Sequence, residues 1–256
     1  MIVLGLDTTG DTGSVAVWRT RTGLVAERSF EGPRAHSVRL PGELLACLHD
    51  ADLRLEDVDA FGVATGPGSL TGLRVGIATA QGLALALGRP LVPITTLEAL
   101  AAHALLASAE GSRSLIGAWI NARRGEVFTA LYRRTTSAPE QQDTLDESTA
   151  LVEAPAVTEP TAAAERWAAL GPGSGALVIA TDTPDGAALV PPELASAARV
   201  VVARLLARIV AELAAVRLAR GAPAGPKAVR PVYLRRPDAE LGREQRAAAA
   251  GGGAAR

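Results

Sequence analysis

The sequence predicts an α/β fold of two lobes, in which the second lobe repeats the plan of the first. Residues 2–30 carry the alternating and β-branched pattern of a hairpin and a third strand, and helix and strand patterns alternate after them. A second hairpin pattern begins at residue 115 and is again followed by helix and strand patterns. Two halves of this kind indicate a duplicated α/β unit.

The first half divides into elements by its periodicity. Ser37 can cap a helix that buries Leu40 and Leu44, and the segment 59–65 is apolar on both faces, as a buried strand is. The expected strands are 2–6, 14–18, 24–30, 59–65 and 91–94, and the expected helices begin at residue 37, run from the glycine-rich segment to 87, and cover 96–106.

In the second half the expected strands are 115–120, 126–133 and 176–180, with turns at 121–125 and 171–175 and a long helix over 195–218. We therefore place an N-terminal lobe at 1–106, a C-terminal lobe at 107–220 with an acidic insertion at about 135–165, and a tail at 221–256. The glycine-rich end of the tail is expected to be disordered.

Composition excludes several classes of protein. The net charge of −1 gives no general attraction to nucleic acid, and no segment approaches the roughly 20 apolar residues of a membrane span. Cys47 is the only cysteine, which excludes a disulfide framework and a cysteine metal cluster. The first residues lack the basic head and cleavage pattern of a signal peptide, so a cytoplasmic protein without membrane contact is expected.

Charge is nevertheless distributed unevenly. The segment 135–165 contains seven acidic residues and no Lys or Arg, whereas 221–256 contains seven basic residues and three acidic ones. Each segment is either a contact surface or a solvated stretch, and composition alone does not distinguish the two.

Asp7, Thr8 and Thr9 follow the first strand and form a turn that could bind a ligand. Free backbone amides and short hydroxyls can hold a phosphate, and an aspartate can hold magnesium through water. Asp-Thr-Thr-Gly is also ordinary turn chemistry, so a ligand site and a purely structural turn both remain open.

The segment GPGSLTGLRVG, residues 66–76, lacks the chemistry of a nucleotide loop. A Walker loop ends in Gly-Lys-Ser or Gly-Lys-Thr, but Thr71, Gly72 and Leu73 stand here. The spacing of the glycines also exceeds that of the dinucleotide fingerprint by one residue. What remains is a tight turn, with Ser69 or Thr71 capping the next helix.

Gly72, Gly76 and Ala80 recur every four residues and form a stripe without bulk along this helix. Glycine within a helix is unfavourable by about 0.5–1 kcal/mol relative to alanine, so the stripe indicates a close packing contact. That contact is either with the chain's own sheet or a neighbouring helix, or with another protein, in which case Leu70 and Leu73 would be apolar knobs on the same surface.

The remaining polar residues do not form a recognisable catalytic pattern. His36, His49 and His103 lack the spacing of a helical zinc pair, so no metal site is expected. No serine stands in a G-x-S-x-G elbow, which leaves a hydrolase triad without support.

Several motifs together resemble the TsaB (YeaZ) family of tRNA threonylcarbamoyladenosine biosynthesis proteins. They are MIVLGLDTT, AHSVRLPGELLACL, GVATGPGSLTGLRVGIATAQGLALALGRPLVPITTLEALA, INARRGEVFTALY and PVYLR. The likeness is specific around 66–76 and weak across the acidic segment and the tail.

The resemblance implies the two-lobed fold of actin, Hsp70 and the sugar kinases, a duplicated ribonuclease H-like (ASKHA) architecture. It also implies a non-catalytic partner of the TsaD-type subunit, which transfers a threonylcarbamoyl group to the adenosine beside the anticodon of tRNAs reading ANN codons. A TsaE-type ATPase, a homodimer, and tRNA contacted indirectly through the complex are implied as further partners. This chain would require no cofactor, and ATP with magnesium would belong to the assembled complex.

In the family, two helices form the surface for homodimers or for the catalytic subunit, and this favours a partner interface at the stripe. The implied interface residues are Gly66, Pro67, Gly68, Ser69, Leu70, Thr71, Gly72, Leu73, Arg74, Gly76, Ile77 and Ala80, with His36, Leu40 and Leu44 of the preceding helix. Asp7, Thr8 and Thr9 would be a vestigial phosphate turn.

The chain departs from the family pattern at defined positions. Leu70 replaces the usual Phe, Asn121 replaces the usual Asp of the second hairpin, and the His-x-x-x-His metal pair of the catalytic relatives is missing. An ATP-dependent kinase or ATPase of the same fold is the alternative function, and Asn121 argues against it. The absent metal ligands likewise argue against a glycoprotease-like metallopeptidase.

Overall fold

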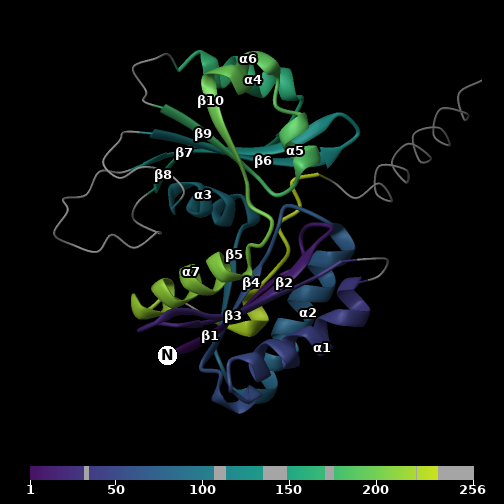
Figure 1. The fold of residues 1–256 in the computed structure, drawn as a ribbon, viewed down its shortest axis with the longest axis vertical. Coiled ribbons are helices and arrows are strands. Elements are labelled where there is room, and N and C mark those ends of the chain that lie inside the picture. Colours follow the sequence, from purple (N-terminus) through teal and green to yellow (C-terminus); the bar gives the residue numbers. More distant parts are fainter. Residues whose placement is uncertain (32–34, 107–113, 135–148, 171–175, 223, 236–256) are drawn as a thin grey trace, which may run out of the picture.

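The computed structural model describes residues 1–31, 35–106, 114–134, 149–170, 176–222 and 224–235. Figure 1 shows two lobes, each built on one sheet, with helices α3 and α7 between the sheets. The expected turn at 171–175, part of the acidic segment and the end of the tail lie outside the described residues.

The first sheet has the strand order β3-β2-β1-β4-β5. β1 pairs with β2 in antiparallel orientation, because a short turn joins the two strands. It pairs with β4 in parallel orientation, and the chain between β1 and β4 runs through β2, β3 and the helix α1. Its strands are β1 (Ile2–Asp7), β2 (Gly13–Arg19), β3 (Gly23–Phe30), β4 (Ala60–Ala64) and β5 (Leu91–Ile94).

The second sheet repeats this plan, since its order β8-β7-β6-β9-β10 places each strand as in the first sheet. β6 is again antiparallel to the next strand, β7, and parallel to β9. Its strands are β6 (Ser114–Arg123), β7 (Glu126–Arg134), β8 (Thr149–Thr158), β9 (Ala176–Thr181) and β10 (Ala198–Val202). The duplication predicted from the two hairpin patterns is confirmed.

Helices cover both sheets on both faces. α1 and α2 pack on the outer face of the first sheet, and α4, α5 and α6 lie over the outer face of the second. The helices are α1 (Ala35–Asp50), α2 (Leu70–Leu87), α3 (Thr96–Leu106), α4 (Pro160–Ala168), α5 (Pro184–Ala188), α6 (Pro192–Ala197) and α7 (Ala207–Ala219), with single turns η1 (Leu55–Asp57) and η3 (Pro226–Ala228).

The two lobes exchange helices. α7, which follows the last strand of the second sheet, packs against β1, β2 and β4 of the first, while α3 packs against β6 and β9 of the second. Glycines allow the closest approach of α7, because a Cβ at Gly5 would collide with the Ala207 carbonyl oxygen and one at Gly62 would lie 2.9 Å from the Val210 carbonyl oxygen. The predicted boundaries at 106 and 220 lie at the ends of α3 and α7, and each of these helices also packs on the sheet of the other lobe.

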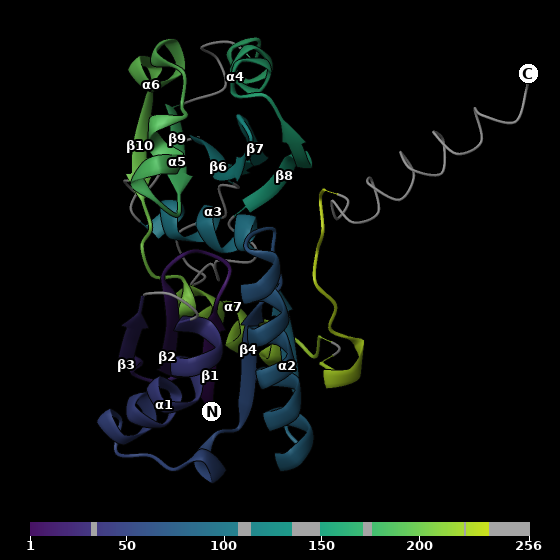
Figure 2. The same ribbon diagram turned by 90° about the vertical axis from the view of Figure 1, so that its right-hand side faces the viewer.

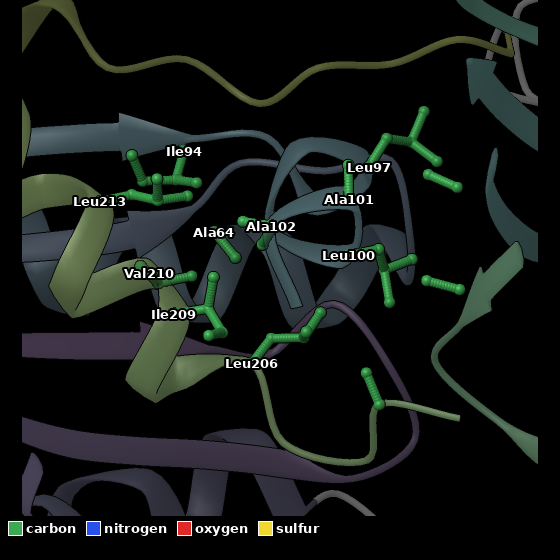
Figure 3. Close-up of a cluster of buried hydrophobic side chains, with 14 of the residues drawn as sticks. Ala64, Ile94, Leu97, Leu100, Ala101, Ala102, Leu206, Ile209, Val210 and Leu213 are labelled. Atoms are coloured by element: carbon green, nitrogen blue, oxygen red, sulfur yellow. The ribbon is translucent and has the colours of Figure 1, made fainter. Parts of the chain in front are cut away.

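One hydrophobic core consequently runs through both lobes. Figure 3 shows Ala64 of the first sheet beside Ala102 of α3, and Ile94 of the first sheet beside Leu213 of α7. The same cluster continues to Ile116 of the second sheet. An ion pair between Arg217 of α7 and Glu98 of α3 also links the two exchanged helices to each other. The lobes are fused by packing rather than joined by an open hinge.

The C-terminal half also differs from the helix predicted over 195–218. β10 (Ala198–Val202) is an edge strand parallel to β9, so the helical stretch is divided into α6 and α7. β8 and α4 occupy the end of the predicted acidic insertion. α1 begins at Ala35, so Ser37 lies in its first turn rather than before it.

Replacing Gly5 with alanine tests the exchange of α7. The added Cβ would lie 2.8 Å from the Ala211 amide nitrogen and closer still to the Ala207 carbonyl oxygen, so we expect the free energy of unfolding in urea to fall by about 1–3 kcal/mol. Gly225→Ala is the matched control, because nothing lies within 4 Å of its Cβ position. Equal stability of the two variants would contradict the packing described here.

Candidate functional site

A cavity of about 330 Å³ lies between the lobes, where the β1–β2 turn faces the β6–β7 turn. Thr9 and Asp11 line it from the first turn, Asn121 and Arg123 from the second, and Asp182 from the end of β9. The size is within the range of small-molecule sites, so the groups around it decide whether a nucleotide fits.

The first turn uses its own polar groups internally. One carboxylate oxygen of Asp7 accepts hydrogen bonds from the Thr9 amide at 2.9 Å and from the Thr9 hydroxyl at 2.7 Å. The Thr8 hydroxyl donates to the Gly72 carbonyl at 2.7 Å, and the Ser69 amide donates to the Thr9 carbonyl at 2.6 Å. From the sequence, Asp7, Thr8 and Thr9 could form either a ligand site or a structural turn. The hydrogen bonds described above explain the turn as a structural one that supports α2.

The second turn has a similar local geometry. Asn121 accepts a hydrogen bond from the Arg123 amide at 2.7 Å, as Asp7 accepts one from an amide two residues later. Arg124 and Gly125 both have positive φ angles, 59° and 76°, which suits the two-residue turn of a hairpin. Arg123 and Asp11 both line the cavity and form an ion pair with each other at 3.0 Å.

Carboxylates dominate the electrostatics of the cavity. Burial, with a further contribution from the charge of Asp7, raises the pKa of Asp182 to about 6. Burial also raises the pKa of Asp7, against the effect of its hydrogen bonds from Thr9. Burial lowers the pKa of His36, so this side chain carries less positive charge to offset them.

A polyphosphate fits these groups poorly. The Thr9 amide already donates to Asp7, while the cavity's arginines, Arg123 and Arg235, pair with Asp11 and Glu126. Lys227, the one lysine of the sequence, is not among the described residues that line the cavity. Among the described residues there is also no group of three or more metal-ligating side chains.

The glycine stripe of α2 faces inward, so the prediction that it receives another protein is wrong. A Cβ at Gly72 would collide with the Thr8 carbonyl oxygen, and one at Gly76 with the Thr8 hydroxyl. Ala80 has no exposed surface and belongs to the core of the first lobe. The stripe lets α2 approach the first turn of its own chain.

Most of the implied interface residues are likewise inaccessible. Those buried inside the chain are Gly66, Pro67, Gly72, Leu73, Gly76, Ile77, Ala80, Leu40 and Leu44. His36, Gly68 and Ser69 are half-buried, and Ser69 caps α2 by accepting a hydrogen bond from the Gly72 amide at 3.3 Å. Leu70, Thr71 and Arg74 are exposed.

A different side of the same two helices is apolar and open. Figure 2 shows α1 and α2 side by side on the outside of the first lobe. Val38, Leu45 and Leu85 expose 72%, 58% and 51% of their surface, and nothing lies within 4 Å of a Cβ built at Gly42 or Gly82. The α1–α2 face is defined here as Val38, Gly42, Leu45, Ala78, Gly82 and Leu85.

Sequence reasoning found these helices but not this face of them. Ala78 and Gly82 repeat the four-residue spacing of the buried stripe on the opposite side of α2, so the signal was present. Two small-residue stripes on one helix cannot be told apart by spacing, because only the packing shows which of them is covered.

α2 is long and apolar enough to cross a membrane by length and composition, the single helix of this kind among the described residues. Its packing gives another explanation. α2 connects β4 to β5, which are adjacent parallel strands of one sheet, so both of its ends belong to the same lobe. The helix is apolar because one side enters the core and the other forms part of the α1–α2 face.

A family model described as TsaD, tRNA N6-adenosine threonylcarbamoyltransferase, matches residues 31–241. The chain belongs to this family. It is 36% identical over 141 residues to the tRNA threonylcarbamoyladenosine biosynthesis protein TsaB of Bacillus subtilis, covering 55% of this chain and 59% of the relative. TsaB of Escherichia coli is 37% identical over 135 residues, or 52% of this chain and 56% of the relative.

The solved structure of YeaZ from Pseudomonas aeruginosa is 27% identical, with a TM-score of 0.71, and the match covers 91% of this chain and 99% of that one. The resemblance to the TsaB (YeaZ) family and the two-lobed fold that it implied are thereby confirmed. The sequence matches span a little over half the length of the curated relatives.

Replacing Asp182 with asparagine tests the electrostatics of the cavity. Its pKa is raised in the folded chain, from 3.8 to about 6, so ionisation opposes folding increasingly between these pH values and has no effect at lower pH. We expect Asp182→Asn to raise the free energy of unfolding by about 1–3 kcal/mol at pH 7 and to leave it unchanged near pH 3.

Urea titrations across this pH range measure the difference, with Asp185→Asn in the exposed first turn of α5 as the control. If Asp182→Asn raised the free energy of unfolding equally at all pH values, the raised pKa of Asp182 would be contradicted.

Proposed function

We propose that this chain is a non-catalytic subunit of the bacterial complex that attaches the threonylcarbamoyl group to the adenosine beside the anticodon of tRNAs reading ANN codons. It docks on the TsaD-type catalytic subunit through the α1–α2 face. The names of the TsaB relatives and of the family model support the pathway. Membership of the TsaD family supports a catalytic partner that presents a similar helix pair.

The observation that carries the proposal is the unpartnered apolar surface of α1 and α2. Val38 and Leu45 on α1 and Leu85 on α2 expose more than half of their surface, beside glycines whose Cβ positions are open. The two helices contact each other, so these exposed apolar side chains stand on neighbouring elements. Exposed apolar surface marks interaction sites, and small residues allow a second helix backbone to approach closely.

Docking can raise the activity of the catalytic subunit only if its active conformation binds the α1–α2 face better than the inactive one does. The fused lobes favour such a role. Because α3 and α7 carry one core through both lobes, the docking helices stand on a rigid support whose shape is fixed before the partner arrives.

The interlobe cavity supports the absence of catalysis by this chain. A kinase or ATPase of this fold needs a phosphate turn with free donors, whereas the Thr9 amide and hydroxyl both donate to Asp7. The proposal therefore assigns no cofactor to this chain and leaves ATP and magnesium to the assembled complex. The TsaE-type ATPase, indirect contact with tRNA, a homodimer through the same face, and a cytoplasmic location belong to the proposal as well.

Replacing Gly82 with leucine tests the docking face. The side chain would enter open space and leave the fold intact, since leucine has a higher helix propensity than glycine. It would hold a partner helix away, so we expect the affinity for the TsaD-type subunit to fall at least about 30-fold, a change of roughly 2 kcal/mol. Titration calorimetry with the purified subunits measures it.

Ala219→Leu is the matched control, because Ala219 is exposed on α7, away from the α1–α2 face. Threonylcarbamoylation of tRNA in the reconstituted system should fall with Gly82→Leu and persist with Ala219→Leu. Undiminished affinity of the Gly82→Leu protein would exclude this face as the docking site.

Replacing Asp7 with asparagine separates the proposal from the kinase or ATPase alternative. Asparagine keeps an oxygen that can accept the Thr9 hydrogen bonds but carries no charge for a metal. We expect tRNA modification by the reconstituted complex to stay within about twofold, and calorimetry to detect no binding of ATP and magnesium to the isolated wild-type chain. ATP turnover by the isolated chain that Asp7→Asn abolishes would establish the alternative.

A further inference from the structure

The segment from Pro226 to Arg235, named here the C-terminal strap, lies along the flank of α2 (Figure 2). The Gln81 side chain donates to the carbonyls of Pro226 at 2.9 Å and Val229 at 3.0 Å, and Val229 is buried in the core of the first lobe. Nearer the N-terminal end of α2, Arg74 donates to the Tyr233 hydroxyl at 3.4 Å. The strap is therefore a fixed border of the outer surface of α2.

This border is positively charged and uncompensated. Arg74, Lys227 and Arg230 are exposed, and neither α2 nor the strap contains an acidic residue. Arg230 donates to the backbone carbonyls of Lys227 and Val229. Within the described part of the chain, none of the three cations forms an ion pair with a carboxylate.

The opposite border, along α1, is neutralised within the chain. Glu43 pairs with Arg28 at 2.9 Å and with Arg39 at 2.7 Å, and Arg28 also pairs with Asp50 at 2.8 Å. The surface of the two helices is thus asymmetric, with internally paired charges along α1 and unpaired cations along the far side of α2.

We propose that the C-terminal strap is the cationic rim of the docking face and that the partner protein presents carboxylates opposite Lys227 and Arg230. The inference rests on the proposed function, because it extends the α1–α2 face by one border. It assigns to the strap a role in choosing and orienting the partner, beyond its packing on α2.

A protein partner suits this rim better than RNA does. The strap is held by Gln81, one helical turn before the exposed Leu85 on α2. Interfaces between proteins combine an apolar centre with a polar rim in this way. Non-specific affinity for nucleic acid arises from neutralising many phosphates, and an apolar helix face beside the cations contributes nothing to it.

Rim charges act mainly on the rate of association and on its dependence on salt, because they attract the partner before the apolar surfaces meet. Reversing two of them should slow association with the TsaD-type subunit about tenfold at low salt and much less at high salt, while dissociation changes little. The apolar centre accounts for the remaining affinity.

The test compares the full-length Lys227→Glu/Arg230→Glu double variant with wild type in surface-binding kinetics against the purified TsaD-type subunit. Arg21→Glu/Arg204→Glu is the matched control, since it reverses two exposed arginines at the β2–β3 turn and before α7. Lys227→Gln/Arg230→Gln should give an intermediate rate. Thermal melting of each variant shows whether the strap stays folded, and the rates are compared among folded variants.

Slower association of the Lys227→Glu/Arg230→Glu variant alone, converging with wild type at high salt, supports the rim. Unchanged rates, or equal slowing by the control pair, overturn it. If Gly82→Leu abolishes binding while the reversed rim does not slow it, the docking face stands and the rim fails; if neither changes binding, the proposed function fails with it. Lower affinity of the complex for tRNA with an unchanged protein–protein rate would also overturn the inference, in favour of an RNA contact.

Discussion

The close contact between α2 and the turn after β1 is the constraint on which the first lobe depends. The Thr8 carbonyl oxygen and hydroxyl lie so near α2 that a Cβ at Gly72 or Gly76 would displace them. The Thr8 hydroxyl donates to the Gly72 carbonyl and the Ser69 amide donates to the Thr9 carbonyl, and these hydrogen bonds hold the turn and the helix together. This contact uses the polar groups that a nucleotide would need. It also fixes the rotation of α2 about its axis, and so determines which residues face solvent.

The exchange of helices holds the two lobes in position relative to each other. α7 lies against the first sheet and α3 against the second, so relative movement of the lobes would have to break their common core. Enzymes that close on a substrate rely on hinges that absorb the change at a few residues. Here the common core leaves no such hinge between the described parts of the lobes, and Arg123 and Asp11 add an ion pair across the cavity.

Much of the fold could be predicted from the sequence, but contacts between distant elements could not. The hairpin patterns and their repetition are local, so the duplicated sheets were visible. The edge strand β10 (Ala198–Val202) was missed because its valines stand in an alanine-rich stretch that resembles a helix. The stripe at Gly72 and Gly76 was correctly identified as a close contact, yet its neighbour is Thr8, and nothing in its spacing distinguishes a turn of the same chain from a foreign helix.

The position of α7 in the chain has a consequence for biosynthesis. β1 and β4 are complete once residue 64 has been made, but the helix that covers Gly5 and Gly62 ends at Ala219. During translation the inner face of the first sheet therefore stays exposed until most of the polypeptide has been synthesised. Contacts between such distant segments slow folding and leave apolar surface open to aggregation, so the nascent first half is a natural client for chaperones.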